Sequence, residues 1–249
     1  MKTIYKNILA QSKNLKPSPQ VDKAFTELVE YATNPRNKPK LYGGQYTKLR
    51  NISSLAEYEL EKENSVLIAS SRNPSSALKD FVYYKNYEDL VTLEYINVSL
   101  IKKINKALFI GGGPLPLTAI ILSHKYGIRC DVLENNLEAV TLAEALISSL
   151  GLSSKVTVIH TNAKDFTLYG AYDCIYLAAM VEQMSPAKIA LIHGIFTSMS
   201  KDSLLLCRSA HLNRKLLYVH VATKNLPVAP ILEVRPYNHI INSFLVLQR

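Results

Sequence analysis

Two glutamates in the first third of the chain, Glu57 and Glu61, are four residues apart and therefore share one face of a helix. Tyr83 and Tyr87 have the same spacing further along, with Tyr84 beside them. A carboxylate close to a phenol could carry acid–base chemistry. From these residues alone, solvent-facing glutamates and packed tyrosine rings remain the default, since the chain contains 15 tyrosines.

A second motif is the glycine-rich segment Gly111–Thr118, which follows the apolar run Ala107–Ile110. Such a run is typical of a buried strand. Three glycines in succession let the chain turn sharply and let its N–H groups approach a ligand. Pro116 suits the first turn of a following helix, and Gly127 can end that helix. A strand, a glycine turn and a helix are how an open α/β sheet holds a nucleotide-like cofactor.

The type of cofactor is indicated by two further residues. Glu134 follows Gly111 by 23 residues, at the end of the next predicted strand. A carboxylate there can accept both ribose hydroxyls of a dinucleotide or of S-adenosylmethionine (SAM). Pro116 stands where a dinucleotide motif needs its third glycine, and proline lacks the N–H that a pyrophosphate would use. The residues therefore favour SAM, with a surface carboxylate near a helix cap as the alternative for Glu134.

Other polar residues follow later predicted strands. Asn162 could contact the edge of an adenine and Ala163 its flat face, although Asn162 could equally be a turn residue. Arg208 and Arg214 could pair with the α-carboxylate of SAM or of an acceptor, with surface charge as the alternative. His211 is open between a pocket wall and a local hydrogen bond.

The secondary structure predicted to position these residues is helical up to about residue 100 and alternates between strands and helices beyond it. Ser18-Pro19 predicts a helix start, and apolar residues then recur at helical spacing from Val21 to Ala32. Residues 35–44 are rich in helix breakers. A second helix is predicted over about 49–68, and a third from Asn73-Pro74 to about Val91. The first hundred residues are therefore expected to be almost wholly helical.

Beyond Lys106, short β-rich runs alternate with helical stretches, which favours a parallel sheet with helices on both faces. These runs are Ala107–Ile110, Cys130–Leu133, Val156–Ile159, Cys174–Leu177, Leu204–Cys207 and Asn242–Leu247. The predicted fold is an α/β protein with a helical domain over residues 1–100 and a Rossmann-like, mostly parallel domain over 101–249.

Composition narrows the function classes. The formal net charge of +9 admits a nucleic-acid partner, but the basic residues are scattered, so a solvated surface is favoured. No apolar stretch has the length of a membrane helix, and no secretory signal is evident. Three widely spaced cysteines lack metal-site spacing and are expected to be reduced thiols. We expect a cytoplasmic enzyme without a metal site.

Several segments together resemble one family. Phe109–Thr118 resembles the signature of nicotianamine synthases and of their bacterial relatives that make opine metallophores such as staphylopine. Asn73-Pro74 and Phe81–Tyr87 are similar to the family's tyrosine motif, Arg208–His211 to its Arg-Ser-Ala-His segment, and Ile241–Ser243 to its last strand. The resemblance spans roughly residues 55 to 249, with valine in place of proline at 82 and leucine in place of glycine at 212.

This resemblance implies a helical domain that caps a SAM-binding domain, and transfer of the 3-amino-3-carboxypropyl group of SAM with release of methylthioadenosine. It implies that Glu61 and Tyr87 act at the reacting amine. The residues expected to bind SAM are Gly111, Gly112, Gly113, Pro114, Leu115, Thr118, Glu134, Asn135, Asn162, Ala163 and Ala178. Those expected to bind the acceptor are Tyr83, Tyr84, Arg208, His211 and Arg214.

The acceptor implied by the family is an amino acid, histidine first, with one transfer per acceptor. We further expect an opine dehydrogenase downstream, allow for a homodimer, and expect no nucleic acid and no membrane as partners. Three alternatives stay open: a SAM-dependent methyltransferase acting on RNA, a catalytically silent nucleotide-binding module, and a dinucleotide oxidoreductase.

Overall fold

The computed structural model describes residues 1–249 and begins with five helices. They are α1 (Lys2–Gln11), α2 (Pro19–Thr33), α3 (Gln45–Ala69), α4 (Pro74–Lys79) and α5 (Tyr84–Ile101). The predicted start of α2 is confirmed, since the Ser18 hydroxyl accepts a hydrogen bond from the Val21 N–H and Pro19 occupies the first turn. No helix combines the length and the apolar character needed to cross a bilayer.

The second part of the chain forms a seven-stranded sheet in the order β3-β2-β1-β4-β5-β7-β6. Its strands are β1 (Lys106–Ile110), β2 (Arg129–Glu134), β3 (Val156–His160), β4 (Cys174–Leu177), β5 (Leu204–Ser209), β6 (Leu232–Val234) and β7 (Ser243–Gln248). β1 to β5 are parallel, whereas β7 runs antiparallel to both β5 and β6. The predicted Rossmann-like, mostly parallel sheet is confirmed.

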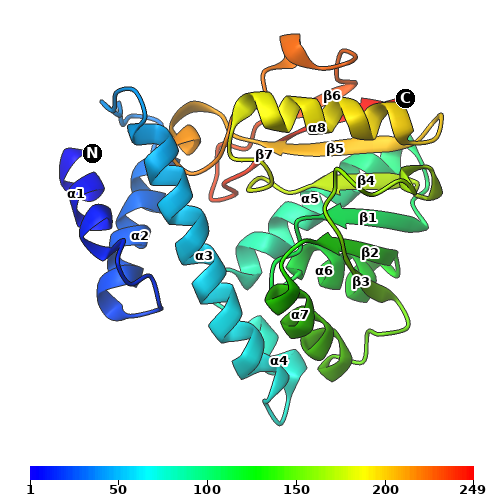
Figure 1. The fold of residues 1–249 in the computed structure, drawn as a ribbon, viewed down its shortest axis with the longest axis horizontal. Helices are drawn as coiled ribbons and strands as arrows, with labels where there is room; N and C mark the ends of the chain where they lie inside the picture. The colour runs from blue at the N-terminus through cyan, green and yellow to red at the C-terminus, as the bar shows by residue number, and fades with distance from the viewer.

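Helices cover both faces of this sheet (Figure 1). On one face lie α5, α6 (Leu117–Tyr126) and α7 (Leu137–Ser149), and on the other lies α8 (Ser185–Ser198). Successive strand residues point to opposite faces. Ala107 and Phe109 of β1 accordingly pack in the core of the first face, and Leu108 and Ile110 in the core of the second.

The long helix α3 lies between this sheet domain and α1 and α2 (Figure 1). Its first half packs through Leu49 and Ile52 into a core shared with α1, α2 and the 3-10 helix Leu212–Leu216. Near its end, Ile68 joins the core of the sheet. The middle of α3, which carries Glu57 and Glu61, is thereby held beside the carboxyl ends of the parallel strands.

Several details differ from the sequence prediction. The single helix expected from Pro74 to about Val91 is two helices, because a turn at residues 80–83 closes with the Tyr84 N–H donating to the Phe81 carbonyl. Pro116 is the N-cap of α6 and lies just before its first turn, where the sequence predicted it within that turn. The three-residue strand β6 was too short to show a pattern. The predicted boundary at residues 100–101 stays a prediction, since α5 shares the core of the sheet.

Candidate active site

A cavity of about 520 Å³ lies at the carboxyl ends of the parallel strands. It is at the point where the strand order reverses, between β1 and β4, which is where open α/β sheets bind ligands. Its walls come from β1, β2, the segments after β3 and β4, the end of β5, and the middle of α3. The volume is in the range typical of small-molecule sites.

The three glycines after β1 form one wall, and none of them has room for a side chain. A Cβ on Gly111 would lie 2.3 Å from Val181 Cγ2, and one on Gly112 would lie 2.3 Å from Val132 Cγ1. Gly111 and Gly113 also have positive φ angles, +86° and +61°, which side chains disfavour. A side chain at any of these positions would displace a neighbouring residue, so the turn requires glycine.

Glu134 holds the glycine turn in place. One carboxylate oxygen accepts a hydrogen bond from the Gly113 N–H at 2.8 Å, and the other accepts from the N–H groups of Asn135 and Asn136, each at 2.9 Å. A carboxylate has about four acceptor positions. Three are engaged within the protein, so Glu134 retains capacity for one ligand hydroxyl rather than for the two expected from the sequence.

Opposite the glycine turn is a cluster of two carboxylates and two phenols. A Cβ on Gly113 would lie only 2.8 Å from Glu61 Oε2, so this carboxylate sits directly against the turn. The Tyr87 hydroxyl donates to Glu57 Oε1 at 3.2 Å and lies 3.5 Å from Glu61 Oε1. The Tyr218 hydroxyl donates to Glu57 Oε2 at 3.3 Å.

The protonation of this cluster is set by burial. Burial raises the pKa of Glu61 well above its usual range, and the nearby charge of Glu57 raises it further. Burial also raises the pKa of Glu57, against the lowering effect of the hydrogen bonds from Tyr87 and Tyr218. The pKa values of both phenols lie well above 10, mainly through burial, so both remain protonated donors. Burial therefore makes both carboxyls of the cluster stronger proton acceptors than solvent-exposed glutamates.

The charges around the cavity favour a cationic ligand. Four carboxylates line it, those of Glu57, Glu61, Glu134 and Glu182, against one cation, Arg208. A buried ion pair already neutralises Arg208: its Nε and Nη2 donate to the two carboxylate oxygens of Glu94, at 2.8 and 2.9 Å. A pyrophosphate would meet repulsion here, whereas a sulfonium would be attracted. No group of three or more His, Cys, Asp or Glu side chains is arranged to hold a metal ion.

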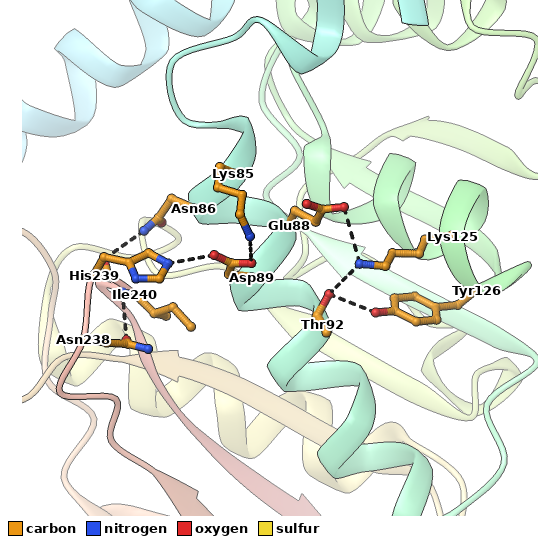
Figure 2. Close-up of polar contacts among 10 residues, drawn as sticks. All are labelled: Lys85, Asn86, Glu88, Asp89, Thr92, Lys125, Tyr126, Asn238, His239 and Ile240. Atoms are coloured by element: carbon orange, nitrogen blue, oxygen red, sulfur yellow. Dashed lines mark hydrogen bonds and ion pairs between the residues drawn. The ribbon is translucent and has the colours of Figure 1, made fainter. Parts of the chain in front are cut away.

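Helix α5, which follows Tyr83 and carries Tyr87, makes polar contacts with two neighbouring elements (Figure 2). Towards the loop before β7, the Asn86 amide donates to the His239 carbonyl at 2.9 Å, and the His239 ring lies 2.7 Å from an Asp89 oxygen. Towards α6, the Lys125 ammonium contacts both Glu88 and Thr92, and the Tyr126 hydroxyl donates to Thr92. These contacts hold the Tyr87 ring against α3 and bring the loop that ends at Asn242 to the cavity.

Most residues predicted from the sequence line this cavity. They are Glu61, Tyr87, Gly111, Gly112, Gly113, Leu115, Thr118, Glu134, Asn135, Asn162, Ala163, Ala178 and Arg208. Asn162 makes a turn, since its side chain accepts from the Lys164 N–H, and its contact with an adenine stays a prediction. Tyr83 lines a second, adjoining cavity.

Four predicted residues lie elsewhere, and their predicted roles in direct binding are not supported by these positions. Pro114 is buried behind the glycine turn, and Tyr84 packs against α6 and the core of the sheet. Arg214 is buried and donates to the Asn238 carbonyl, and His211 is buried against the ring of Tyr237. The strand ending at Ser209 turns away from the cavity before it reaches them.

The sequence patterns did not reveal several residues at the centre of the site. Glu57 was noted only for its spacing. Asn242 was placed in the predicted last strand without a role in the site, and Tyr218 carries no local signal because it comes from an irregular segment. Glu94 does carry one: with Val91 and Val98 it lies on the buried face of α5, and a carboxylate on an apolar face needs a partner. That partner is Arg208.

Comparison with known proteins agrees with this geometry. The sequence model of the family described as nicotianamine synthase protein matches residues 1–249. The chain is 32% identical to a nicotianamine synthase of Solanum lycopersicum, over 97% of this chain and 80% of that protein. It is 30% identical to nicotianamine synthase 1 of Arabidopsis thaliana over the same shares.

Solved structures show the same fold. MtNAS in complex with MTA and tNA superposes with a TM-score of 0.87 at 22% identity, covering 100% of this chain and 96% of that one. The mitomycin 7-O-methyltransferase MmcR gives a TM-score of 0.57 at 12% identity, covering 97% of this chain and 72% of that one. With a family match along its whole length and about 30% identity to curated members, the protein belongs to the nicotianamine synthase family.

Proposed function

We propose that the protein transfers the 3-amino-3-carboxypropyl group of SAM to the amine of an amino-acid acceptor and releases methylthioadenosine. One contact supports this reaction above all: the Glu61 carboxylate lies against the glycine turn at Gly113, where the sulfonium side chain of SAM would end. The relatives named nicotianamine synthase and the MtNAS complex with MTA point the same way. Cavity size, glycine wall and surplus of carboxylates all fit SAM.

The reaction is a displacement at the γ-carbon of SAM, whose sulfonium is already a leaving group. A bond forms between the acceptor nitrogen and that carbon, while the carbon–sulfur bond breaks and its electrons stay on sulfur. Glu61 takes the proton that the acceptor ammonium must lose, and Glu57 stabilises it there through the shared cluster. Holding the two reactants in line can supply about 7–11 kcal/mol of the barrier.

Tyr87 and Arg208 would position the acceptor. The Tyr87 phenol donates to Glu57 and so sets the orientation of the cluster. Arg208 uses Nε and Nη2 on Glu94 and Thr118, which leaves Nη1 without a hydrogen bond in the protein. Because Arg208 is the one cation lining the cavity, its Nη1 is the natural donor for an acceptor carboxylate.

Histidine is the acceptor we favour, with one aminobutyrate group added, in a nicotianamine-like or opine metallophore synthesis inside the cytoplasm. In such a route an opine dehydrogenase would take the product, which would bind the metal after release. A dimeric enzyme is compatible with this proposal.

The experiment that tests the proposed function is incubation of the protein with SAM and a panel of L- and D-amino acids, followed by mass spectrometry. Methylthioadenosine together with an aminobutyrate-bearing acceptor is the expected result. Release of S-adenosylhomocysteine would instead show a methyltransferase, and failure of SAM to raise the melting temperature would restore the dinucleotide alternative.

The rate of transfer should depend on pH through the carboxylate cluster. Burial raises the pKa values of Glu57 and Glu61. The pH at which kcat/KM rises should therefore lie above the ordinary pKa range of carboxyl groups. The two carboxyls interact, so the apparent pKa belongs to the pair. A pH series of initial rates of methylthioadenosine release measures it, and a limb at or below about pH 4.5 would contradict the proposed base.

The stability of the protein without ligand should decrease as pH rises, whereas the rate of transfer should increase. A carboxyl whose pKa is raised by folding stabilises the folded state fully below its unfolded pKa, and this contribution is lost as pH rises through the folded value. The melting temperature of Glu61→Gln relative to the wild type should therefore increase between about pH 5 and pH 8. A difference that is constant over this range would contradict the raised pKa.

The wall formed by residues 178–183 depends on one buried ammonium. Lys188 is 1% exposed, and its Nζ donates to the carbonyls of Ala178, Ala179 and Val181, each at 2.9 Å. Lys188→Met keeps the apolar stem but leaves three carbonyls without a donor, each costing about 1–3 kcal/mol. The Kd for SAM, measured by calorimetry, should rise roughly tenfold or more. The exposed Lys201→Met is the matched control, and an unchanged Kd in Lys188→Met would contradict this role.

A further inference from the structure

A second cavity, of about 430 Å³, meets the first at the carboxylate cluster. The residues common to both are Glu57, Tyr87, Tyr218 and Asn242. From there it runs between α2, α3 and the turn before α5, and its outer end reaches the surface at the exposed residues Asp22, Asp80 and Val82. A molecule whose amine lies at the cluster can therefore extend its other end through this cavity towards solvent.

All the charged residues that line this cavity are acidic. Three of the residues lining it are acidic, Glu57 at the inner end and Asp22 and Asp80 at the outer end, and none is Lys, Arg or His. The Asp22 and Asp80 carboxylates make no ion pair and no side-chain hydrogen bond within the protein. They are therefore free to act on whatever occupies the cavity.

An unpartnered buried donor also faces this space. Asn242 lines both cavities, is 7% exposed, and its Nδ2 has no hydrogen-bond partner. A buried donor without a partner costs free energy in the empty site and is satisfied when a ligand supplies an acceptor. The junction of the two cavities thus has a position for a polar group of the ligand, next to the cluster where the amine would react.

We propose that the side chain of the acceptor amino acid occupies the second cavity, and that Asp22 and Asp80 select neutral or basic side chains and reject acidic ones. This inference rests on the proposed transfer reaction and specifies its substrate class. The acceptor α-carboxylate lies on the other side of the cluster, near Arg208, which is the one cation lining either cavity. The rest of the molecule then meets carboxylates, amides, hydroxyls and apolar groups, and no cation.

The same charge arrangement limits the reaction to one transfer. After the first transfer, the new amine belongs to the added aminobutyrate group, whose own carboxylate can lie near Arg208. A second molecule of SAM could react only if the original acceptor, with its carboxylate, moved into the second cavity. A carboxylate there would face Asp22 and Asp80 without a cation to pair with. The product with one aminobutyrate group should therefore leave.

Pairs of acceptors with the same shape and different charge test this selectivity. With SAM saturating, kcat/KM from methylthioadenosine release should be at least about tenfold higher for glutamine than for glutamate. Arginine and histidine should also react faster than glutamate. Mass spectrometry should show one added aminobutyrate group per acceptor.

Charge variants link the selectivity to the two aspartates. The double variant Asp22→Asn with Asp80→Asn should bring the glutamine-to-glutamate ratio close to one and raise KM for arginine, with the Kd for SAM unchanged. Asp22→Lys should raise kcat/KM for glutamate relative to glutamine, compared with the same ratio in the wild type. Glu30→Gln is the matched control, because Glu30 lies on the same helix, is exposed and lines neither cavity.

The outcomes separate the selectivity from the reaction itself. Equal wild-type rates with glutamine and glutamate would overturn the selectivity while leaving the transfer reaction intact. A ratio that is unaffected in the double aspartate variant, or a main product with two aminobutyrate groups, would do the same. Absence of methylthioadenosine with every acceptor, although SAM binds, would overturn the proposed function together with this inference.

Discussion

Replacing Glu61 by glutamine is expected to reduce kcat for methylthioadenosine release by on the order of 10²–10⁴-fold. Glutamine keeps the shape of the side chain beside Gly113 but cannot take the proton of the acceptor ammonium. The affinity for SAM should change little, because glutamine fills the same space and the carboxylates of Glu57, Glu134 and Glu182 still line the cavity. Rate measurements at saturating SAM, together with calorimetric titration of SAM, give both quantities.

The control for this variant is Glu63→Gln, two residues along the same helix, where the side chain is exposed and lines neither cavity. It should have the kcat of the wild type. An unchanged kcat in Glu61→Gln would assign proton removal to another group, with Glu57 as the remaining carboxylate of the cluster. A large loss of SAM affinity would instead show that Glu61 acts on the sulfonium.

Replacing Gly113 by alanine is expected to lower kcat by about 10²-fold. Its Cβ would lie 2.8 Å from Glu61 Oε2, so the carboxylate must move from the glycine turn. A displacement of about 1 Å of a reacting group can have an effect of this size. The residue also has a φ of +61°, which should reduce the free energy of unfolding by about 1–2 kcal/mol.

Gly127→Ala separates these two effects. Gly127 has a similar φ of +71° and ends α6, and a Cβ at this residue would have no atom within 4 Å, so alanine there adds backbone strain without the contact. Both variants should lose comparable stability in urea unfolding, and only Gly113→Ala should lose kcat. Equal activities of the two variants would show that the contact between Gly113 and Glu61 is not needed for transfer.

The order of the elements could be predicted from the sequence because it depends on local patterns. The apolar run Ala107–Ile110, the glycines after it and Gly127 all act within a few residues of themselves, and the structure confirms the strand, the turn and the end of the helix. The same holds for the cap Ser18, whose side chain accepts from the Val21 N–H three residues away. Where the local signal was absent, as at the turn over residues 80–83, the prediction was wrong.

By itself, then, the sequence determined the alternation of strands and helices, the position of the glycine turn and the shared face of Glu57 and Glu61, since each follows from spacing along one segment. Only the tertiary structure decided which side chains meet. Tyr218 and Asn242 reach the carboxylate cluster from distant loops, Arg208 finds Glu94 across the core, and Arg214 is directed away from the cavity. The charge of each cavity is the sum over such distant residues, and no local pattern contains that sum.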